Sequence, residues 1–122
     1  MARHSTLQEV KEGALLSKGS TLTIASGIIT VTDSFHLVAT EGAASSDNLY
    51  TINGGHTAGQ IVVLMNDGNV VSVKKSTGAS GTPDNIYLGD DTHLADDTDT
   101  ITLMYTGSKW VGLASRSANQ PS

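Results

Sequence analysis

The sequence of 122 residues contains no cysteine, so disulfide bonds and zinc sites held by thiolates are excluded. Positive charge is also scarce: 7 lysine and arginine residues stand against 12 acidic ones, for a formal net charge of -5. Nucleic-acid binding requires clustered lysine and arginine, and the only adjacent pair is Lys74 and Lys75. No segment approaches the roughly 18 consecutive apolar residues of a membrane span. We therefore expect no nucleic-acid partner and no membrane partner.

Apolar side chains make up 38% of the sequence and aromatic ones only 4%, with a single tryptophan. A chain of this length is expected to form one domain with one small core. Because so little apolar surface is available, we expect self-association to complete the core. The N-terminus also lacks the long apolar stretch of a signal peptide, so we expect the product to be released into the cytoplasm where it is made.

The clearest structural signal in the sequence is a strand pair near the C-terminus. Its two alternating segments flank Gly107–Ser108, which fits a two-residue type II′ loop with glycine at the first central position. That loop would place Tyr105 opposite Trp110 and Ile101 opposite Ala114. Since aromatic residues are rare, we expect the tyrosine and the tryptophan to form the thickest part of the core.

Two more two-residue loops, Ser26–Gly27 and Asp67–Gly68, predict hairpins of the same kind, the second with a type I′ turn. In all, about nine strand candidates follow one another at spacings of about 8 to 12 residues, which is typical of an all-β sandwich or barrel. The segments expected to pair are 21–25 with 28–32, and 61–65 with 70–74.

Between these hairpins, residues 34–40 alternate as a strand, and we expect Phe35 to face the core and His36 to lie on the opposite side. Residues 41–48 and 76–85 are small, polar or rich in glycine, so we expect loops there. Further short strands are expected at 49–52, 86–88 and 93–95.

These patterns together predict an all-β protein, a single antiparallel β-sandwich that is jelly-roll-like, over residues 21–117. An N-terminal arm, 1–20, precedes it and a tail, 118–122, follows it. The core residues that we expect are Phe35, Leu64, Val73, Leu103, Tyr105 and Trp110.

The predicted arm, residues 1–20, has too few apolar residues among its charges to pack firmly. Two interpretations stay open: a frayed terminus, or a segment that becomes ordered only against a neighbouring subunit or a larger surface. On the second interpretation, the residues that contact the larger surface or another subunit are Arg3, His4, Leu7, Val10, Leu15 and Leu16.

The most conspicuous charged feature is a run of five aspartates. These residues lack the alternate spacing and the glycine of a calcium-binding EF-hand loop, so a divalent-ion site is the weaker interpretation and solvated loop residues the stronger one. Asp97 or Asp99 is expected to hold a turn. The run comprises Asp90, Asp91, Asp96, Asp97 and Asp99.

Other candidates for chemistry are equally weak in the sequence. The histidines at 4, 36, 56 and 93 lie in separate segments without the spacing of a zinc motif. Asp33, Ser34 and His36 resemble a catalytic triad in composition, but neighbouring side chains on a strand point to opposite faces. No glycine-rich segment has the ending of a phosphate-binding loop. We therefore expect no enzyme activity, no cofactor and no metal.

The order of several motifs resembles a β-domain found in virion proteins of tailed bacteriophages, namely capsid decoration proteins, head fibres and tail fibres. The resemblance spans about Ile28 to Ser117, and relatives of this kind are frequently homotrimers. The motifs that carry it are Ser34-Phe35-His36-Leu37-Val38-Ala39-Thr40-Glu41-Gly42, Leu49-Tyr50-Thr51-Ile52-Asn53-Gly54-Gly55, Gly59-Gln60-Ile61-Val62-Val63-Leu64, Asp99-Thr100-Ile101-Thr102-Leu103, Trp110 and Ser115-Arg116-Ser117.

This resemblance implies a structural role and offers no catalytic residues to transfer. A small chain with a short N-terminal arm fits a decoration, or cement, protein that binds the outside of a capsid and stabilises the head. The expected partners are the major capsid protein lattice and further copies of the chain, most simply as a homotrimer, and the expected location is the capsid surface of the virion. The alternative is a tail-fibre or head-fibre module that binds a host receptor or glycan.

Overall fold

The computed structural model of the chain describes residues 16–76 and 84–116. These residues form eleven β-strands and one short 3-10 helix, Glu41–Ala43, with no α-helix among them. The prediction of an all-β protein is therefore confirmed. The predicted tail, 118–122, and most of the predicted loop at 76–85 lie outside the described residues.

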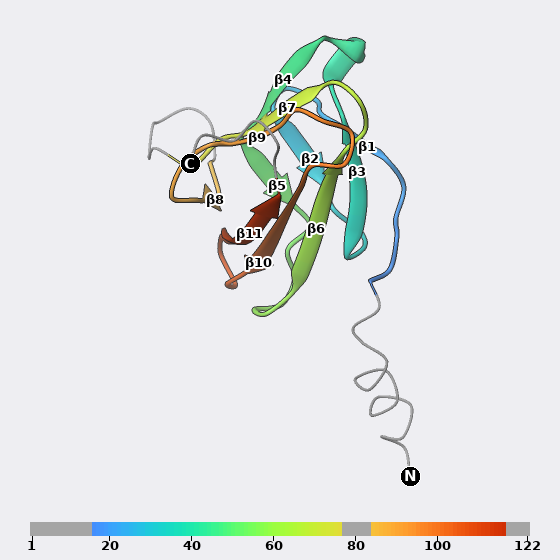
Figure 1. The fold of residues 1–122 in the computed structure, drawn as a ribbon. Coiled ribbons are helices and arrows are strands. Elements are labelled where there is room, and N and C mark those ends of the chain that lie inside the picture. Colours follow the sequence, from blue (N-terminus) through green and yellow to red (C-terminus); the bar gives the residue numbers. More distant parts are fainter. Residues whose placement is uncertain (1–15, 77–83, 117–122) are drawn as a thin grey trace.

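The strands belong to three sheets that enclose a common core (Figure 1). The large sheet has six strands in the order β1-β3-β6-β10-β11-β8, a two-stranded sheet joins β2 to β5, and a three-stranded sheet has the order β4-β7-β9. The strands are β1 (Leu22–Thr23), β2 (Ile28–Thr30), β3 (Phe35–Ala39), β4 (Ser46–Leu49), β5 (Thr51–Asn53), β6 (Ile61–Asn66), β7 (Val70–Val73), β8 (Ile86–Tyr87), β9 (Thr92–Leu94), β10 (Thr100–Tyr105) and β11 (Trp110–Arg116).

The first seven strands coil around the core in successive turns. Strand β3 pairs in parallel with β1 and with β6, β5 pairs in parallel with β2, and β7 pairs in parallel with β4. Each turn of the chain thus adds a strand beside the equivalent strand of the turn before, which is the arrangement of a β-solenoid.

The last strands reverse this direction. Strand β9 is antiparallel to β7, β10 is antiparallel to β6, and β11 returns antiparallel to β10. The short β8 then pairs in parallel with the start of β11. The C-terminal part of the chain therefore covers β6 and β7, whose edges would otherwise offer unpaired backbone groups to other chains.

The prediction of a single antiparallel sandwich is thus wrong in its topology. At Ser26–Gly27 only an isolated bridge joins Ala25 to Ile28, and the strands on either side enter different sheets. At Asp67–Gly68 the strands β6 and β7 also diverge into different sheets, and Asp67 does not adopt the positive φ of a type I′ turn. Both loops are corners of the coil because the partner strands lie a full turn away along the chain. The predicted loop at 41–48 also contains the start of β4.

The C-terminal hairpin forms around the predicted loop. Gly107 has a φ of 108°, and Tyr105 lies opposite Trp110. The predicted register fails farther along, because a bulge between Thr102 and Leu103 shifts the pairing by one residue. Ile101 therefore lies opposite Ser115 instead of Ala114. Such an extra residue cannot be read from the alternation of the two segments alone.

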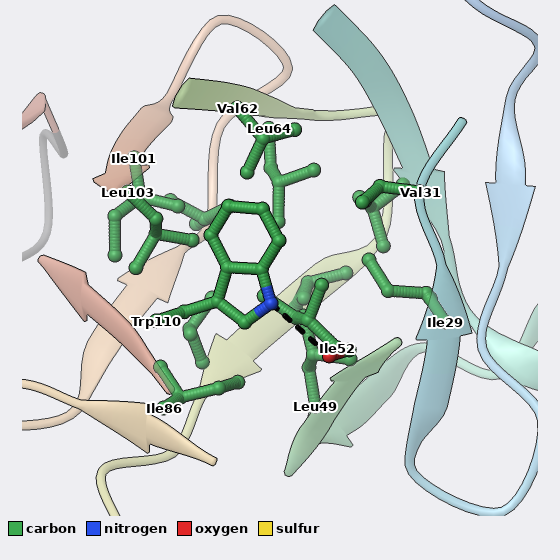
Figure 2. Packing of buried hydrophobic residues seen from close by; sticks show 14 of the residues in the cluster. Ile29, Val31, Leu49, Ile52, Val62, Leu64, Ile86, Ile101, Leu103 and Trp110 are labelled. Atoms are coloured by element: carbon green, nitrogen blue, oxygen red, sulfur yellow. Dashed lines mark hydrogen bonds between the residues drawn. The ribbon is translucent and has the colours of Figure 1, made fainter. Parts of the chain in front are cut away.

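The core is a single cluster of aliphatic residues from all three sheets, with the Trp110 ring in the middle (Figure 2). Of the six core residues expected from the sequence, four have no exposed surface, and Tyr105 is half-buried with its ring centroid 5.1 Å from that of Trp110. Phe35 is the exception. It lies half-buried on the outer face of β3, while His36 and Val38 point inward. The four fully buried residues are Leu64, Val73, Leu103 and Trp110.

The backbone of Ile52 is the point where the sheets are joined. The side chain of Asn85 accepts a hydrogen bond from Ile52 N at 2.9 Å and donates one to Ile52 O at 2.7 Å. Trp110 Nε1 donates to the same carbonyl oxygen at 3.1 Å (Figure 2), and Trp110 N donates to Asn85 O at 2.7 Å. The amide of Asn85 therefore pairs with β5 as the backbone of a neighbouring strand would.

Replacing Trp110 by alanine removes the largest buried side chain together with one of these hydrogen bonds. We expect Trp110→Ala to lower the free energy of unfolding by about 3 to 5 kcal/mol, as large-to-small changes in a packed core do. Urea denaturation followed by circular dichroism measures it, with Leu16→Ala as an exposed control. A loss smaller than about 0.5 kcal/mol would show that the tryptophan does not support the core.

Replacing Asn85 by aspartate keeps the side-chain shape but removes the donor to Ile52 O and turns a carboxylate oxygen toward that carbonyl. We expect Asn85→Asp to cost about 1 to 3 kcal/mol at pH 7, the range for an unsatisfied buried polar group. The matched control is Asn69→Asp, because Asn69 is exposed at a corner. Equal unfolding midpoints for the two variants in urea would contradict the assigned role of Asn85.

Candidate functional site

Most of the residues expected to contact a capsid or another subunit lie outside the described residues: Arg3, His4, Leu7, Val10 and Leu15. Leu16 is described and is 45% exposed. The next residues are already attached to the large sheet, since Phe35 N donates to Ser17 O at 3.0 Å and Gly19 N donates to Phe35 O at 2.7 Å. The end of the predicted arm therefore runs beside β3 and delivers Leu16 to the surface there (Figure 1).

His36 is fully buried and both of its ring nitrogens are occupied. Nε2 accepts hydrogen bonds from the backbone nitrogens of Thr32 and Asp33, each at 3.0 Å. Nδ1 lies 2.7 Å from Ser20 O, so it carries the proton and donates to that carbonyl. Both ring nitrogens are therefore engaged with backbone groups, and neither is left to bind a metal. A side chain at Gly19 would not fit, because its Cβ would clash with His36 Cε1.

Asp33 and Ser34, the neighbours of His36 in the triad-like segment, also hold the chain in place. The Asp33 carboxylate accepts hydrogen bonds from the hydroxyls of Ser17 at 3.0 Å and Thr32 at 2.9 Å. Ser34 Oγ accepts from Ser17 N at 2.7 Å. No hydrogen bond connects these two side chains to the imidazole, so they form no nucleophile and base pair.

The aspartate run is divided between two structural tasks. Asp99 is fully buried, and its Oδ2 accepts hydrogen bonds from Ala95 N and Asp96 N, each at 3.0 Å. Its Oδ1 lies 3.3 Å from Arg116 Nη1. The carboxylate thus closes the turn between β9 and β10, as the sequence predicts for Asp97 or Asp99.

Asp91 belongs instead to an ion pair at the surface. Its Oδ2 lies 2.9 Å from Lys74 Nζ, and its Oδ1 accepts a hydrogen bond from Lys75 N at 2.9 Å. Burial raises the pKa of Asp91, but the hydrogen bonds from Lys74 and Lys75 outweigh this effect and bring that pKa below its ordinary value. The hydrogen bond to Asp91 in turn raises the pKa of Lys74.

The described residues contain no group of three or more histidine, aspartate or glutamate side chains that could hold a metal ion. His93 lies on β9 with its Nδ1 2.8 Å from Ser72 Oγ, and His56 is exposed in another part of the chain. Asp90 lies 3.7 Å from Lys75 Nζ at the surface. The described histidines and aspartates are therefore not gathered into a cluster of three or more that could hold a metal ion.

The surface formed by residues 16–76 and 84–116 includes two recesses of similar size. One, of about 320 Å³, lies beside the 3-10 helix and offers the polar side chains of Thr23, Thr40, Asp67 and Asn69. The other, of about 270 Å³, lies where the chain after β8 diverges from β11, and Leu88, Ile101 and Leu113 are among its lining residues. Neither of these two linings includes an aromatic side chain on which a sugar could stack.

Comparison with known proteins adds no family, since no protein-family model and no curated protein sequence matches this chain. The search for a membrane span is also negative for the part of the chain that the structure describes, where no helix is long and apolar enough to cross a bilayer. The resemblance to phage virion domains therefore rests on the sequence motifs alone.

The Lys74–Asp91 ion pair makes part of the stability depend on pH. Because the pKa of Asp91 is lowered in the folded state, its contribution is present above the unfolded-state pKa and is lost as the pH falls through the folded-state pKa. Asp91→Asn keeps an acceptor for Lys75 N but removes the charge. We expect it to lower stability by about 0.2 to 1 kcal/mol at pH 7, as exposed ion pairs do.

This difference should shrink as the pH falls through the acid range in which Asp91 becomes protonated. Urea titrations of both proteins at a series of pH values measure this difference. Asp90→Asn is the control, because Asp90 is largely exposed and its 3.7 Å ion pair with Lys75 is longer than the 2.9 Å pair of Asp91 with Lys74. A difference between wild type and Asp91→Asn that is constant down to the lowest pH would contradict the assignment.

Proposed function

We propose that this chain is a structural protein of a tailed-bacteriophage virion, a capsid decoration (cement) protein that binds the outer capsid surface and stabilises the head. The observation that supports a passive role most strongly is the use of the buried polar side chains. His36, Asn66 and Asp99 each bond to backbone groups at bends of the chain. Thr40 Oγ1 likewise donates to Ala44 O at 2.6 Å. Such groups maintain a shape, and catalysis would require them to be available to a substrate.

The architecture also suits a subunit that adds stiffness to a lattice. A core shared by three sheets and closed by the reversed C-terminal strands gives a rigid body without a deep cleft among the described residues. A decoration protein acts by adding contact area across neighbouring capsomers, and repetition over the lattice gives avidity to contacts that are individually weak. We assign the major capsid protein lattice as the partner, with residues 1–20 as the attachment segment and a homotrimer as the assembly.

A second candidate, a tail-fibre or head-fibre module, is favoured by one observation. The parallel pairing of β1, β3 and β6 is a coil that further turns could extend along an axis, as a fibre requires. In that case the polar recess beside Asp67 and Asn69 is the place for a receptor or glycan.

Co-sedimentation distinguishes the two candidates. We expect the full-length protein to sediment saturably with empty capsids of the phage that encodes it. The substitutions Leu7→Asp and Val10→Asp together should abolish this binding, because they place charge on the apolar residues of the proposed attachment segment. Their unfolding temperature should stay unchanged.

The matched variant for this experiment is Asp67→Ala, which alters the polar recess and should leave capsid binding intact. Binding to host cells that is lost in Asp67→Ala, without sedimentation on capsids, would refute the decoration role and support the fibre module. Absence of binding to both capsids and cells would refute both candidates.

A further inference from the structure

The large sheet is apolar on both faces. Its central strand β6 reads Ile61-Val62-Val63-Leu64-Met65, with Val62 and Leu64 fully buried in the core. Ile61, Val63 and Met65 are half-buried on the opposite, outer face. Strands with apolar residues on both sides are typical of sheets that are covered on both faces, whereas a sheet with one face in water alternates apolar and polar residues.

The strand register extends this apolar character across the sheet. Val63 lies opposite Phe35 on β3, and Met65 lies opposite Leu37. Ile61 lies opposite Met104 on β10. We call this surface the outer face and define it by Phe35, Leu37, Ile61, Val63, Met65 and Met104.

The same row continues toward the C-terminal edge. Met104 lies opposite Val111 on β11, which lies opposite Tyr87 on β8. Tyr87 is 44% exposed and has Lys109 Nζ 4.6 Å from its ring centroid. An apolar strip therefore crosses the sheet from β6 to β8 and ends at the Tyr87 ring. Lys109 places a positive charge at this edge of the strip, which is where protein interfaces usually carry their polar groups.

Charge is absent from the centre of the outer face. The positions opposite Val63 and Met65 on β10 are the small, neutral Thr102 and Thr100. The rows reach charged positions at the two edges of the sheet: Lys18 lies opposite Phe35, and Arg116 pairs with Thr100 and is bonded to Asp99 and to Thr98. Two copies of a chain with a net charge of -5 repel one another, so a neutral surface such as this one favours contact between them.

The size of the outer face suits a small protein contact. With the strip on β11 and β8 included, the face spans five strands spaced about 4.8 Å apart, which gives a footprint of at most roughly 400 Å² per copy, because β8 has only 2 residues. Two such faces together bury about 800 Å² before side-chain relief and the rim are counted, which is less than the roughly 1,000 Å² that a stable specific interface should clear, so we expect a weak contact that depends on protein concentration. The threonines beside methionine and valine give the surface the relief that allows two sheets to interdigitate.

We propose that the outer face is the surface through which copies of this chain associate. A second copy matches it, because it presents the same neutral, apolar surface. Residues 1–15 of the same chain match it less well, because they carry Arg3, Glu9, Lys11 and Glu12 among few apolar residues. The inference rests on the part of the proposed function that assigns a homo-oligomer, and it names the surface that forms it. It does not depend on capsid binding, since copies can associate whether or not they bind a capsid.

The test compares the mass of the full-length protein with that of a variant charged at the centre of the outer face. Light scattering after size exclusion, over a wide range of concentration, should show oligomers for the wild type and the monomer mass for Val63→Lys. The lysine stem can lie along the outer surface with its ammonium in water, so the fold should survive. The matched control is Thr30→Lys on the exposed side of β2, which should stay oligomeric.

Circular dichroism and Trp110 fluorescence report whether each variant is folded, and Met104→Lys serves the same purpose if Val63→Lys does not fold. Because the chain has no cysteine, Val63→Cys supplies a single thiol. A short bis-maleimide should link copies of Val63→Cys into covalent dimers and leave Thr30→Cys largely unlinked.

Three results would overturn the proposal. The first is a wild-type protein that is monomeric at every concentration. A monomer that binds phosphatidylcholine vesicles would show that a lipid surface covers the outer face, and a monomer whose N-terminal residues shield the Val63→Cys thiol would show that the chain covers it itself. The second is an oligomer that persists in both folded lysine variants. The third is equal cross-linking of Val63→Cys and Thr30→Cys. These measurements contain no capsids, so failure of capsid binding cannot be mistaken for failure of self-association.

Discussion

The hydrogen bonds at Ile52 are the constraint on which the fold depends. Thr51 N donates to Gly27 O and Val31 N donates to Asn53 O, so the residues on either side of Ile52 bond toward β2. In a parallel ladder the N–H and C=O groups of the intervening residue, Ile52, point away from β2. On that side of β5 the two-stranded sheet has no third strand to pair with them. Ile52 is buried, and an unpaired amide there would be costly. Asn85 and Trp110 satisfy it, and in doing so they attach the C-terminal strands to the coil.

The same solution recurs wherever the coil bends. His36 fills a gap in the pairing of β3 with the preceding segment, where the five residues from Lys18 to Leu22 lie beside the four from Phe35 to Val38. Asn66 donates from its amide to Leu94 O and accepts from Gly68 N at the corner after β6. A solenoid has more corners than a sandwich, and each corner buries backbone groups that leave one sheet before they enter the next. Short polar side chains supply the missing partners.

Much of the local structure was predictable and the topology was not. Alternation and turn residues identified an all-β chain and the loop at Gly107–Ser108 because those signals act over a few residues. A two-residue turn says that the chain bends, but the partner of β2 is β5, about 23 residues away, and no local pattern specifies it. At the candidate site, the turn role of Asp99 followed from its residue type, whereas its bond to Arg116 depends on the register of β11.

The misplacement of Phe35 has a cause that bears on the assembly. The alternation along β3 correctly separated Phe35 and Leu37 on one face from His36 on the other. Because Phe35 and Leu37 are more apolar than His36, their face was predicted to be the buried one, whereas it is the outer one. The inward position of His36 is favoured by its backbone hydrogen bonds, which no hydropathy scale counts. A chain with few apolar residues that still places phenylalanine, leucine and methionine on an outer face loses stability as a monomer unless that face is covered. If copies cover it, stability rises with protein concentration, and folding and assembly become parts of one equilibrium.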